Sequence, residues 1–366
     1  MLSGTRESIP CWVRGIRLDP NGRRLTLSAG LAPAGIGRLR YTAQVEPIQL
    51  AGTNLSVSRL CFGNMTFGSQ TDEASAARMI DCCFANGINF LDTANIYNKG
   101  AAEEMLGKLL VGRRHRVVLA TKVRGAMGTG PDEKGLSRAA ILRAVDDSLR
   151  RLQTDYVDLY YLHQPDYDVP IEETLETMRR LIEQGKVRYP AISNYASWQA
   201  THMLHLAERN QWAPARVAQQ MYNLVARGLE QEFVPMASAL NFSIVAYNPL
   251  AGGMLTGKQN RQAPLPGTRF DDNKMYLDRY WHAAYFDAVE ELGTIAAEAG
   301  RSLISLSLNW LLHHTTTACV ILGASRLEHL EANLKASTEG PLSEDTLTRC
   351  DAVWAKLRGP APKYNR

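Results

Sequence analysis

The chain has 366 residues, enough for two ordinary domains or for one large α/β barrel. With 45% apolar and 21% charged residues, and no apolar run long enough to span a bilayer, it has the composition of a soluble globular protein and not of a membrane-embedded one. The net charge of +4 is unevenly placed: residues 1–40 carry +5, from seven arginines against two acids, so the remainder carries −1, which argues against nucleic acid as a partner.

The arginine-rich opening, residues 1–40, is interpreted as a disordered extension or as translated sequence upstream of the native start. A transit peptide is the alternative, although the segment lacks the apolar core of a secretory signal. The six cysteines show no CxxC and no metal-ligand spacing, so we predict no metal site and interpret them as reduced thiols of an intracellular, cytoplasmic protein. They are Cys11, Cys61, Cys82, Cys83, Cys319 and Cys350.

From about residue 41 short apolar segments alternate with longer amphipathic ones. The apolar segments predict eight strands, at residues 58–63, 88–94, 117–123, 157–163, 187–193, 217–223, 242–248 and 318–323. Helical spacing of apolar residues predicts helices between them, as in EASAARMIDCCFANG, SRAAILRAVDDSLRRL and PIEETLETMRRLIEQGK.

Eight strands, each followed by a helix, predict an α/β fold of the (β/α)8 TIM barrel type over residues 41–366. A doubly wound sheet is the rival, but its first strand would normally lead into a glycine-rich phosphate turn, and FGNMTFGSQ does not fit GxGxxG. Two segments depart from the alternation. Residues 250–281 predict a long loop after strand 7, and residues 343–357 predict an extra C-terminal helix that packs on the outside of the barrel.

Four polar residues follow the ends of neighbouring predicted strands. In NFLDTANIYNKG (89–100) the second strand ends in Asp92 and Tyr97 follows five residues later, while the third strand ends in Lys122 and the fourth in His163. Taken singly, each has a structural interpretation, such as a helix cap for Asp92 or a solvated charge for Lys122. Barrel enzymes carry their chemistry at these strand ends, so the four together indicate a catalytic site.

The four side chains together fit the reduction of a carbonyl group, in which a phenol gives a proton to the carbonyl oxygen while hydride arrives from a cofactor. A free phenol has a pKa of about 10. We expect the Lys122 ammonium to lower the pKa of Tyr97, Asp92 to keep Lys122 charged, and His163 to donate to the carbonyl. A barrel lyase or isomerase with Lys122 as a Schiff-base amine is a further alternative, but it leaves Tyr97 without a role.

From residue 41 onward the chain resembles an aldo-keto reductase. The matching stretches, in chain order, are FLDTANIY, ATK, DYVDLYYLHQPD, GKVRYPAISNY, QQMYNL, VAYNPLAGGMLTGK and LGASRLEHLEANL. LAGGMLTGK and GASxxxxLxxN resemble the branch that contains potassium-channel β subunits, aflatoxin aldehyde reductases and many bacterial aldo/keto reductases.

The resemblance implies that Tyr97 is the general acid, that Lys122 and Asp92 tune it, and that His163 orients the carbonyl. It also implies that a nicotinamide cofactor binds across the same mouth. Its carboxamide would be hydrogen-bonded by Ser193, Asn194 and Gln219, with Tyr247 stacked under the ring. Its phosphates and adenosine would be held by Lys258, Arg269, Gly323, Ser325, Arg326, His329 and Asn333.

Cations near the start of the last barrel helix favour the extra 2′-phosphate of NADPH over NADH, which remains possible. The chain departs from the branch in having His329 in place of glutamine and Ala332 in place of a frequent glutamate. Both changes bear on the adenine and 2′-phosphate region. In RYPAISNY, Pro190 and Ala191 replace an apolar residue and a glycine, and the proline removes a ladder donor from a central strand.

The sequence therefore predicts NADPH-dependent, reversible reduction of an aldehyde or ketone to an alcohol, with a small-molecule carbonyl compound as the partner and neither nucleic acid nor membrane. The alternative is a nucleotide-binding regulatory subunit resembling the potassium-channel β subunits. Oligomeric state and substrate stay open, because substrate choice depends on loops, here residues 127–137 and 250–281.

Overall fold

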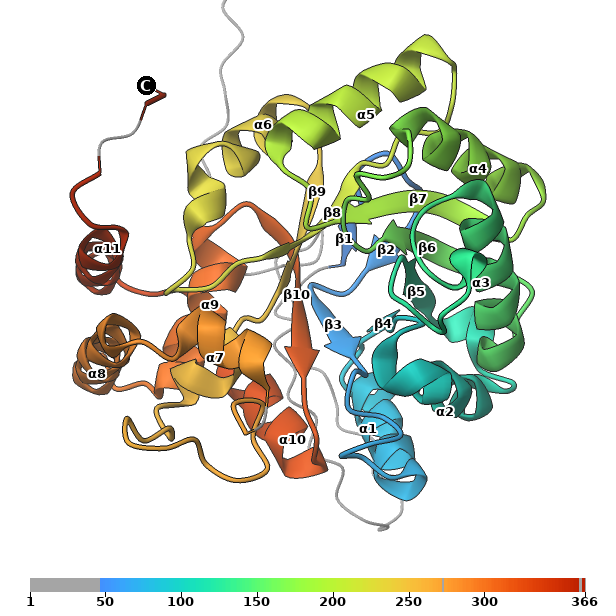
Figure 1. The fold of residues 1–366 in the computed structure, drawn as a ribbon. Coiled ribbons are helices and arrows are strands. Elements are labelled where there is room, and N and C mark those ends of the chain that lie inside the picture. Colours follow the sequence, from blue (N-terminus) through green and yellow to red (C-terminus); the bar gives the residue numbers. More distant parts are fainter. Residues whose placement is uncertain (1–46, 272, 362–363, 366) are drawn as a thin grey trace, which may run out of the picture. The chain divides into compact units, whose positions relative to one another are not determined.

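The computed structural model describes residues 47–271, 273–361 and 364–365, and the expectations for residues 1–40 lie outside this part of the chain. Eight parallel strands close into a barrel in the order β10-β3-β4-β5-β6-β7-β8-β9, which confirms the predicted (β/α)8 fold (Figure 1). The barrel strands are β3 (Leu60–Gly63), β4 (Phe90–Asp92), β5 (Val118–Val123), β6 (Val157–Leu162), β7 (Val187–Ser193), β8 (Val217–Met221), β9 (Ser243–Tyr247) and β10 (Thr317–Gly323).

Helices separate the strands along the chain and surround the barrel (Figure 1). They are α1 (Glu73–Ala85), α2 (Ala101–Leu110), α3 (Arg138–Leu152), α4 (Ile171–Glu183), α5 (Ser197–Arg209), α6 (Phe233–Ala239), α7 (Lys274–Tyr280), α8 (Ala283–Glu298), α9 (Leu303–His314), α10 (Leu327–Ser337) and α11 (Glu344–Arg358). Side-chain caps fix several starts, since Asp72 accepts from the Ser75 N–H before α1 and Ser137 from the Ala140 N–H before α3.

The strands are buried on both faces, so they contribute to two apolar layers. One layer fills the barrel and includes Phe90, Leu159 and Tyr161. The other lies between the strands and the helices, where α1 contributes Met79 and Ile80 at helical spacing. With its interior packed, the barrel can accept a ligand only at its mouth.

A small antiparallel hairpin, β1 (Ile48–Gln49) with β2 (Ser56–Val57), precedes the barrel and was not predicted from the sequence. Its turn inserts Leu50 and Leu55 into the apolar layer inside the barrel. The Ala51 N–H donates to Ser243 Oγ at the start of β9. The hairpin therefore covers the end of the barrel where the strands begin and leaves the opposite end open.

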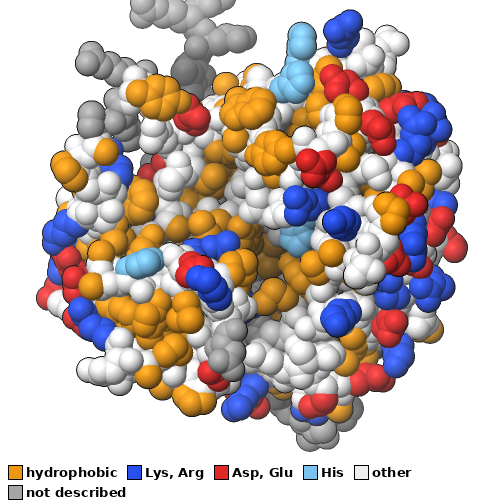
Figure 2. All heavy atoms as spheres, viewed as in Figure 1, with side chains coloured by type: hydrophobic (Ala, Val, Ile, Leu, Met, Phe, Trp, Pro, Cys, Tyr) orange, Lys and Arg blue, Asp and Glu red, His pale blue; other side chains and the backbone are white. Residues whose placement is uncertain are grey.

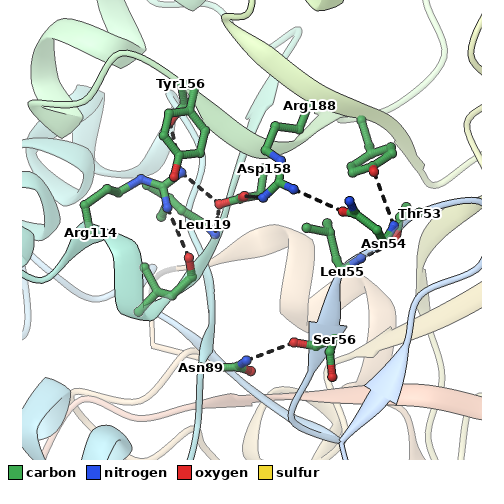
Figure 3. Close-up of polar contacts among 12 residues, drawn as sticks. Thr53, Asn54, Leu55, Ser56, Asn89, Arg114, Leu119, Tyr156, Asp158 and Arg188 are labelled. Atoms are coloured by element: carbon green, nitrogen blue, oxygen red, sulfur yellow. Dashed lines mark hydrogen bonds and ion pairs between the residues drawn. The ribbon is translucent and has the colours of Figure 1, made fainter.

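Asp158, at the start of β6 and 1% exposed, organises the polar contacts around the hairpin (Figure 3). Its Oδ2 accepts from Arg114 at 2.8 Å and from the Leu119 N–H at 2.9 Å, and its Oδ1 accepts from Arg188 at 2.8 Å. Arg188 also donates to Asn54 in the hairpin turn. One buried carboxylate thus ties β5, β6, β7 and the hairpin together.

Replacing Asp158 with Asn is expected to lower the free energy of unfolding by about 3 kcal/mol, because it leaves two arginines without their shared buried counter-ion. Urea denaturation followed by circular dichroism measures this change. The matched control is Asp147→Asn, which removes a carboxylate that is 38% exposed and pairs with Arg150. The control should cost less than about 1 kcal/mol. Equal losses in the two variants would contradict the structural role of Asp158.

Residues 250–281 follow β9, the seventh strand of the barrel, as predicted. The segment is less irregular than its composition indicated. It contains a 3₁₀ turn over Ala251–Thr256 and the short helix α7, and aromatic contacts anchor it. The Phe270 ring lies 6.1 Å from the Tyr276 ring and 5.3 Å from the Trp281 ring. Gly252, in a left-handed conformation, lets the chain pass Tyr276, because a Cβ there would lie 2.7 Å from the Tyr276 ring.

The predicted C-terminal helix is present as α11, which packs against α8. Pro190 lies within β7, and pairing of β7 with β8 begins only at Ile192, consistent with the missing N–H.

Within the described residues, no helix combines the length and apolar content needed to cross a bilayer. The five cysteines in that part of the chain are free.

Candidate active site

Tyr97 follows β4 on a tight turn that points it back toward the strand ends. The next three residues, Asn98, Lys99 and Gly100, all have left-handed backbone conformations, with φ of 50°, 54° and 96°. Asn98 tolerates this conformation and also anchors the turn, since its Nδ2 donates to the carbonyls of Met65 and Phe67 at 2.9 and 2.6 Å. The turn therefore connects the loops that follow β3 and β4.

Lys122, on β5, is fully buried and uses all three of its ammonium protons. Its Nζ donates to Asp92 Oδ1 at 2.5 Å, to the Thr93 carbonyl at 2.7 Å and to the Tyr97 hydroxyl at 3.3 Å. The second oxygen of Asp92 accepts from Gln219 Nε2 at 2.8 Å. The structure thus pairs Asp92 with Lys122 and gives it no capping role.

Burial by itself would lower the pKa of Lys122, but the charges and hydrogen bonds of Asp92 and Tyr97 outweigh it, so the pKa lies above its ordinary value. Burial raises the pKa of Asp92, an effect that Lys122 and Gln219 oppose. Lys122 therefore stays an ammonium ion at neutral pH, as the sequence analysis expected.

Lys122 lowers the pKa of Tyr97, as expected, but a larger influence that the sequence analysis did not consider acts in the opposite direction. Burial is the largest influence and raises the pKa of the phenol above 10. The Lys122 charge lowers it, but by less, and the Asp92 charge raises it again. Tyr97 is consequently a neutral hydroxyl group, a proton donor and not a phenolate, throughout the neutral range.

His163 follows β6 and lies edge-on to Tyr97, with ring centroids 6.1 Å apart and planes at 81°. Its backbone is fixed on both sides, because its N–H donates to Val123 and its carbonyl accepts from Asn194. Burial and the charges of Lys122 and Arg124 lower the pKa of His163 to about 3. The imidazole is therefore neutral and has one N–H to donate.

A second group of predicted residues lies at the ends of β7, β8 and β9. Asn194, at φ 62°, accepts from the Tyr247 hydroxyl at 2.6 Å and donates to Ser193 Oγ at 3.0 Å. The side-chain nitrogen of Gln219 donates to Asp92, so this residue supports the pair of Asp92 and Lys122. The structure brings this group next to the first, since Gln219 donates to Asp92 at 2.8 Å.

A third group surrounds the end of β10 and the start of α10. Burial is the largest influence that lowers the pKa of His329, and the charges of Lys258 and Arg326 lower it further, which indicates that both cations lie near this side chain. Arg269 passes over Gly323, where a Cβ would lie 3.0 Å from the guanidinium. Ser325 precedes α10 with its carbonyl bound by Thr71, and Asn333 is buried within α10.

The first turn of α10 has no side-chain cap, so its amide groups are available to an anion. Together with three nearby cations, this makes the third group suitable for a phosphate-bearing ligand. The face of the barrel that carries segment 250–281 is hollowed near its centre, with hydrophobic and basic side chains around the hollow (Figure 2). No cluster of His, Cys, Asp and Glu in the described ranges could hold a metal ion.

Sequence reasoning missed several residues that support the site. Asn98 could have been found from the preference of asparagine for left-handed turns. Tyr276, whose hydroxyl accepts a hydrogen bond from Arg269 at 3.1 Å, lies in the segment 250–281 that the sequence analysis had noted. The contribution of the Thr93 carbonyl to Lys122 has no sequence signal, because every residue carries a carbonyl.

Comparison with known proteins assigns the family. A model of the Aldo/keto reductase family matches residues 59–355. The chain belongs to the aldo/keto reductase family. As an aldo/keto reductase it is an oxidoreductase that acts on carbonyl groups, and the resemblance found in its motifs is confirmed.

The named branches are also found among its relatives. The chain is 35% identical to aflatoxin B1 aldehyde reductase member 2 of Rattus norvegicus over 322 residues, covering 83% of this aldo/keto reductase and 86% of the relative. It is 36% identical to a probable voltage-gated potassium channel subunit beta of Arabidopsis thaliana, covering 80% and 91%. It is 34% identical to the uncharacterized oxidoreductase YrpG of Bacillus subtilis (strain 168), covering 87% and 99%.

Proposed function

We propose that this aldo/keto reductase reduces an aldehyde or ketone to the alcohol with NADPH, and that Tyr97 donates the proton. The observation that carries the proposal is the contact of the Tyr97 hydroxyl with a buried ammonium that is itself held by Asp92. A neutral phenol, a charged lysine and a neutral histidine at one mouth are the groups that a carbonyl oxygen gaining negative charge requires. Relatives named aldehyde reductases support the same chemistry.

The chain's own residues would divide the work as follows. The neutral His163 donates its N–H to the carbonyl oxygen and orients it, and Tyr97 gives its proton to the same oxygen. Lys122 stabilises the phenolate that remains, and Asp92 holds Lys122 in place. NADPH would supply the hydride when bound. The reverse direction, alcohol oxidation, uses the same groups with Tyr97 as base.

The residues present fit a nicotinamide cofactor. Ser193, Asn194 and Gln219 would hold its carboxamide, and the flat face of Tyr247, oriented by the bond to Asn194, would lie against the ring. The uncapped start of α10 and the cations Lys258, Arg269 and Arg326 would hold its phosphates.

Replacing Arg326 with Ala is expected to weaken NADPH binding by about 10- to 100-fold and NADH binding by less than about 3-fold, because Arg326 is assigned to the 2′-phosphate that only NADPH carries. Fluorescence titration with both cofactors measures the two dissociation constants. Lys335→Ala, which removes an exposed cation from the last turn of the same helix, is the charge-matched control. Equal losses of affinity for NADPH and NADH would contradict the assignment of Arg326 to the 2′-phosphate.

The rate of reduction should have a simple pH dependence. Reduction needs the phenol proton, so the rate has its full value below the pKa of Tyr97 and falls as the pH rises through that pKa, which burial raises above 10. His163, with a pKa of about 3, stays neutral over the same range. Single-turnover rates should therefore be level from about pH 5.5 to about pH 9 and fall only beyond. A falling limb near pH 7 would contradict the assignment of these two groups.

The relative named as a channel β subunit favours one alternative, a nucleotide-binding regulatory subunit. Initial rates of NADPH oxidation with a panel of aryl aldehydes, dicarbonyls and sugars separate the two functions. Turnover of at least one carbonyl compound is expected. Tight NADPH binding with no turnover of any member would favour the regulatory function.

A further inference from the structure

Arg124 is a cation without a partner at the edge of the mouth. It follows β5 directly, two residues after Lys122. Within the described part of the chain its guanidinium forms no ion pair, and its Nε is buried with no hydrogen-bond acceptor. A buried N–H without an acceptor is costly, and a ligand with an anionic oxygen would supply the acceptor that the Arg124 Nε lacks.

The backbone holds Arg124 in an unusual conformation, with φ of 129°. The Gly135 N–H donates to its carbonyl at 2.9 Å, and the adjacent Gly125 lies against Ile96, where a Cβ would be only 2.4 Å from Cδ1. The loop after β5 is thereby clamped to the segment that carries Tyr97. Strain of this kind persists where the surroundings impose it, and it occurs preferentially at ligand sites.

A second unpartnered group lies near Arg124. Strands β5 and β6 pair Val123 with Leu162, which sets Arg124 beside His163, and Tyr195 follows the next strand. Tyr195 is 4% exposed, and its hydroxyl has no hydrogen-bond partner among the residues that the structure describes. Burial raises the pKa of Tyr195 and the charge of Arg124 opposes that rise, so the two side chains are close enough to interact.

Asp166 is the carboxylate at this edge that also acts on Tyr195, and no ion pair joins it to Arg124 in the described part of the chain. Its Oδ2 accepts from the Leu136 N–H at 2.8 Å, and its Oδ1 accepts from the Asp168 N–H at 3.2 Å. The positive charge of Arg124 therefore remains available to the mouth.

We propose that Arg124 and Tyr195 bind a carboxylate group carried by the carbonyl substrate, so that the enzyme prefers carboxylated aldehydes or ketones to neutral ones. The inference rests on the proposed reductase function and adds the substrate class. The cofactor phosphates are not the anion in question, because their assigned residues surround β10, which lies opposite β6 in the barrel order. A guanidinium fork and a phenol hydroxyl match the two oxygens of a carboxylate.

The test compares 4-carboxybenzaldehyde with 4-nitrobenzaldehyde, whose nitro group has the same shape without the charge. Arg124→Gln is expected to lower kcat/KM for the carboxylated aldehyde by about 10- to 100-fold and to change it for the nitro compound by less than about 3-fold. Arg124→Lys should give an intermediate loss, because it keeps the charge and loses the fork. Tyr195→Phe should lower only the carboxylated rate, by about 3- to 10-fold.

Lys134→Gln is the matched control, since Lys134 is an exposed cation on the same loop and its loss should leave the ratio of the two rates unchanged. The proposal is overturned if Arg124→Gln lowers both rates equally or neither, or if the wild-type enzyme reduces the nitro compound and not the carboxylated one. In these cases the reductase function stands. If the wild-type enzyme reduces no carbonyl compound at all, the proposed function fails together with this inference.

Discussion

Replacing Tyr97 with Phe is expected to lower the single-turnover rate of aldehyde reduction by about 1,000-fold or more, because a positioned general acid contributes 10²–10⁴-fold. The substitution removes only the hydroxyl. The ring that meets His163 edge-on remains, and Lys122 loses the longest of its three hydrogen bonds and keeps those to Asp92 and Thr93. NADPH affinity should stay within about 3-fold of the wild type, since the groups proposed to bind its phosphates lie around β10 and α10.

Tyr156→Phe is the matched control for this loss. Tyr156 lies at the covered end of the barrel, where its ring stacks with Arg114 at 4.2 Å, so removing its hydroxyl should leave the rate unchanged. A Tyr97→Phe enzyme that reduces aldehydes at more than about a tenth of the wild-type rate would show that the proton comes from elsewhere.

Replacing Lys122 with Met is expected to abolish reduction and to lower the free energy of unfolding by about 3–5 kcal/mol. The stability loss arises because Asp92 is 3% exposed and would lose the cation that offsets the cost of burying its carboxylate. Urea denaturation and single-turnover kinetics measure the two effects separately. Lys108→Met is the control, since the Lys108–Glu73 pair has a distance of 3.4 Å and both side chains are 58% exposed.

The double variant Lys122→Met with Asp92→Asn separates stability from chemistry. Removing both charges should restore at least half of the lost stability, because no unpaired carboxylate remains. Reduction should stay abolished, since the phenolate formed from Tyr97 still lacks its neighbouring ammonium. If the double variant lost as much stability as the Lys122→Met and Asp92→Asn single variants lose together, this result would contradict the buried ion pair.

The barrel could be predicted because its signals are local. The predicted strand at 187–193 coincides with β7, and the others differ by one or two residues at one or both ends. The β1–β2 hairpin was missed because each strand has only two residues and no alternation can be read from so few. The helices within 250–281 were missed because the segment is rich in Gly, Pro, Lys and Arg, which indicates a loop, whereas aromatic contacts around Phe270 order it.

The residues of the candidate site could be predicted from the sequence, but the directions of their pKa shifts could not. Strand-end positions placed Asp92, Tyr97, Lys122 and His163 together, since parallel strands end on one face. The direction of the Tyr97 pKa shift could not be predicted, because it depends on how deeply the hydroxyl is buried relative to its distance from Lys122. The bond between Gln219 and Asp92 joins residues 127 positions apart, and no local pattern indicates it.

The most direct test of the central claim follows the hydride itself. Purified enzyme is supplied with NADPH carrying two deuterium atoms at nicotinamide C4 and with an aryl aldehyde, and the alcohol is analysed by mass spectrometry. A reductase gives an alcohol with one deuterium on the former carbonyl carbon, formed in step with NADP⁺. Unlabelled alcohol, or tightly bound NADPH that is never oxidised, would contradict the proposed function.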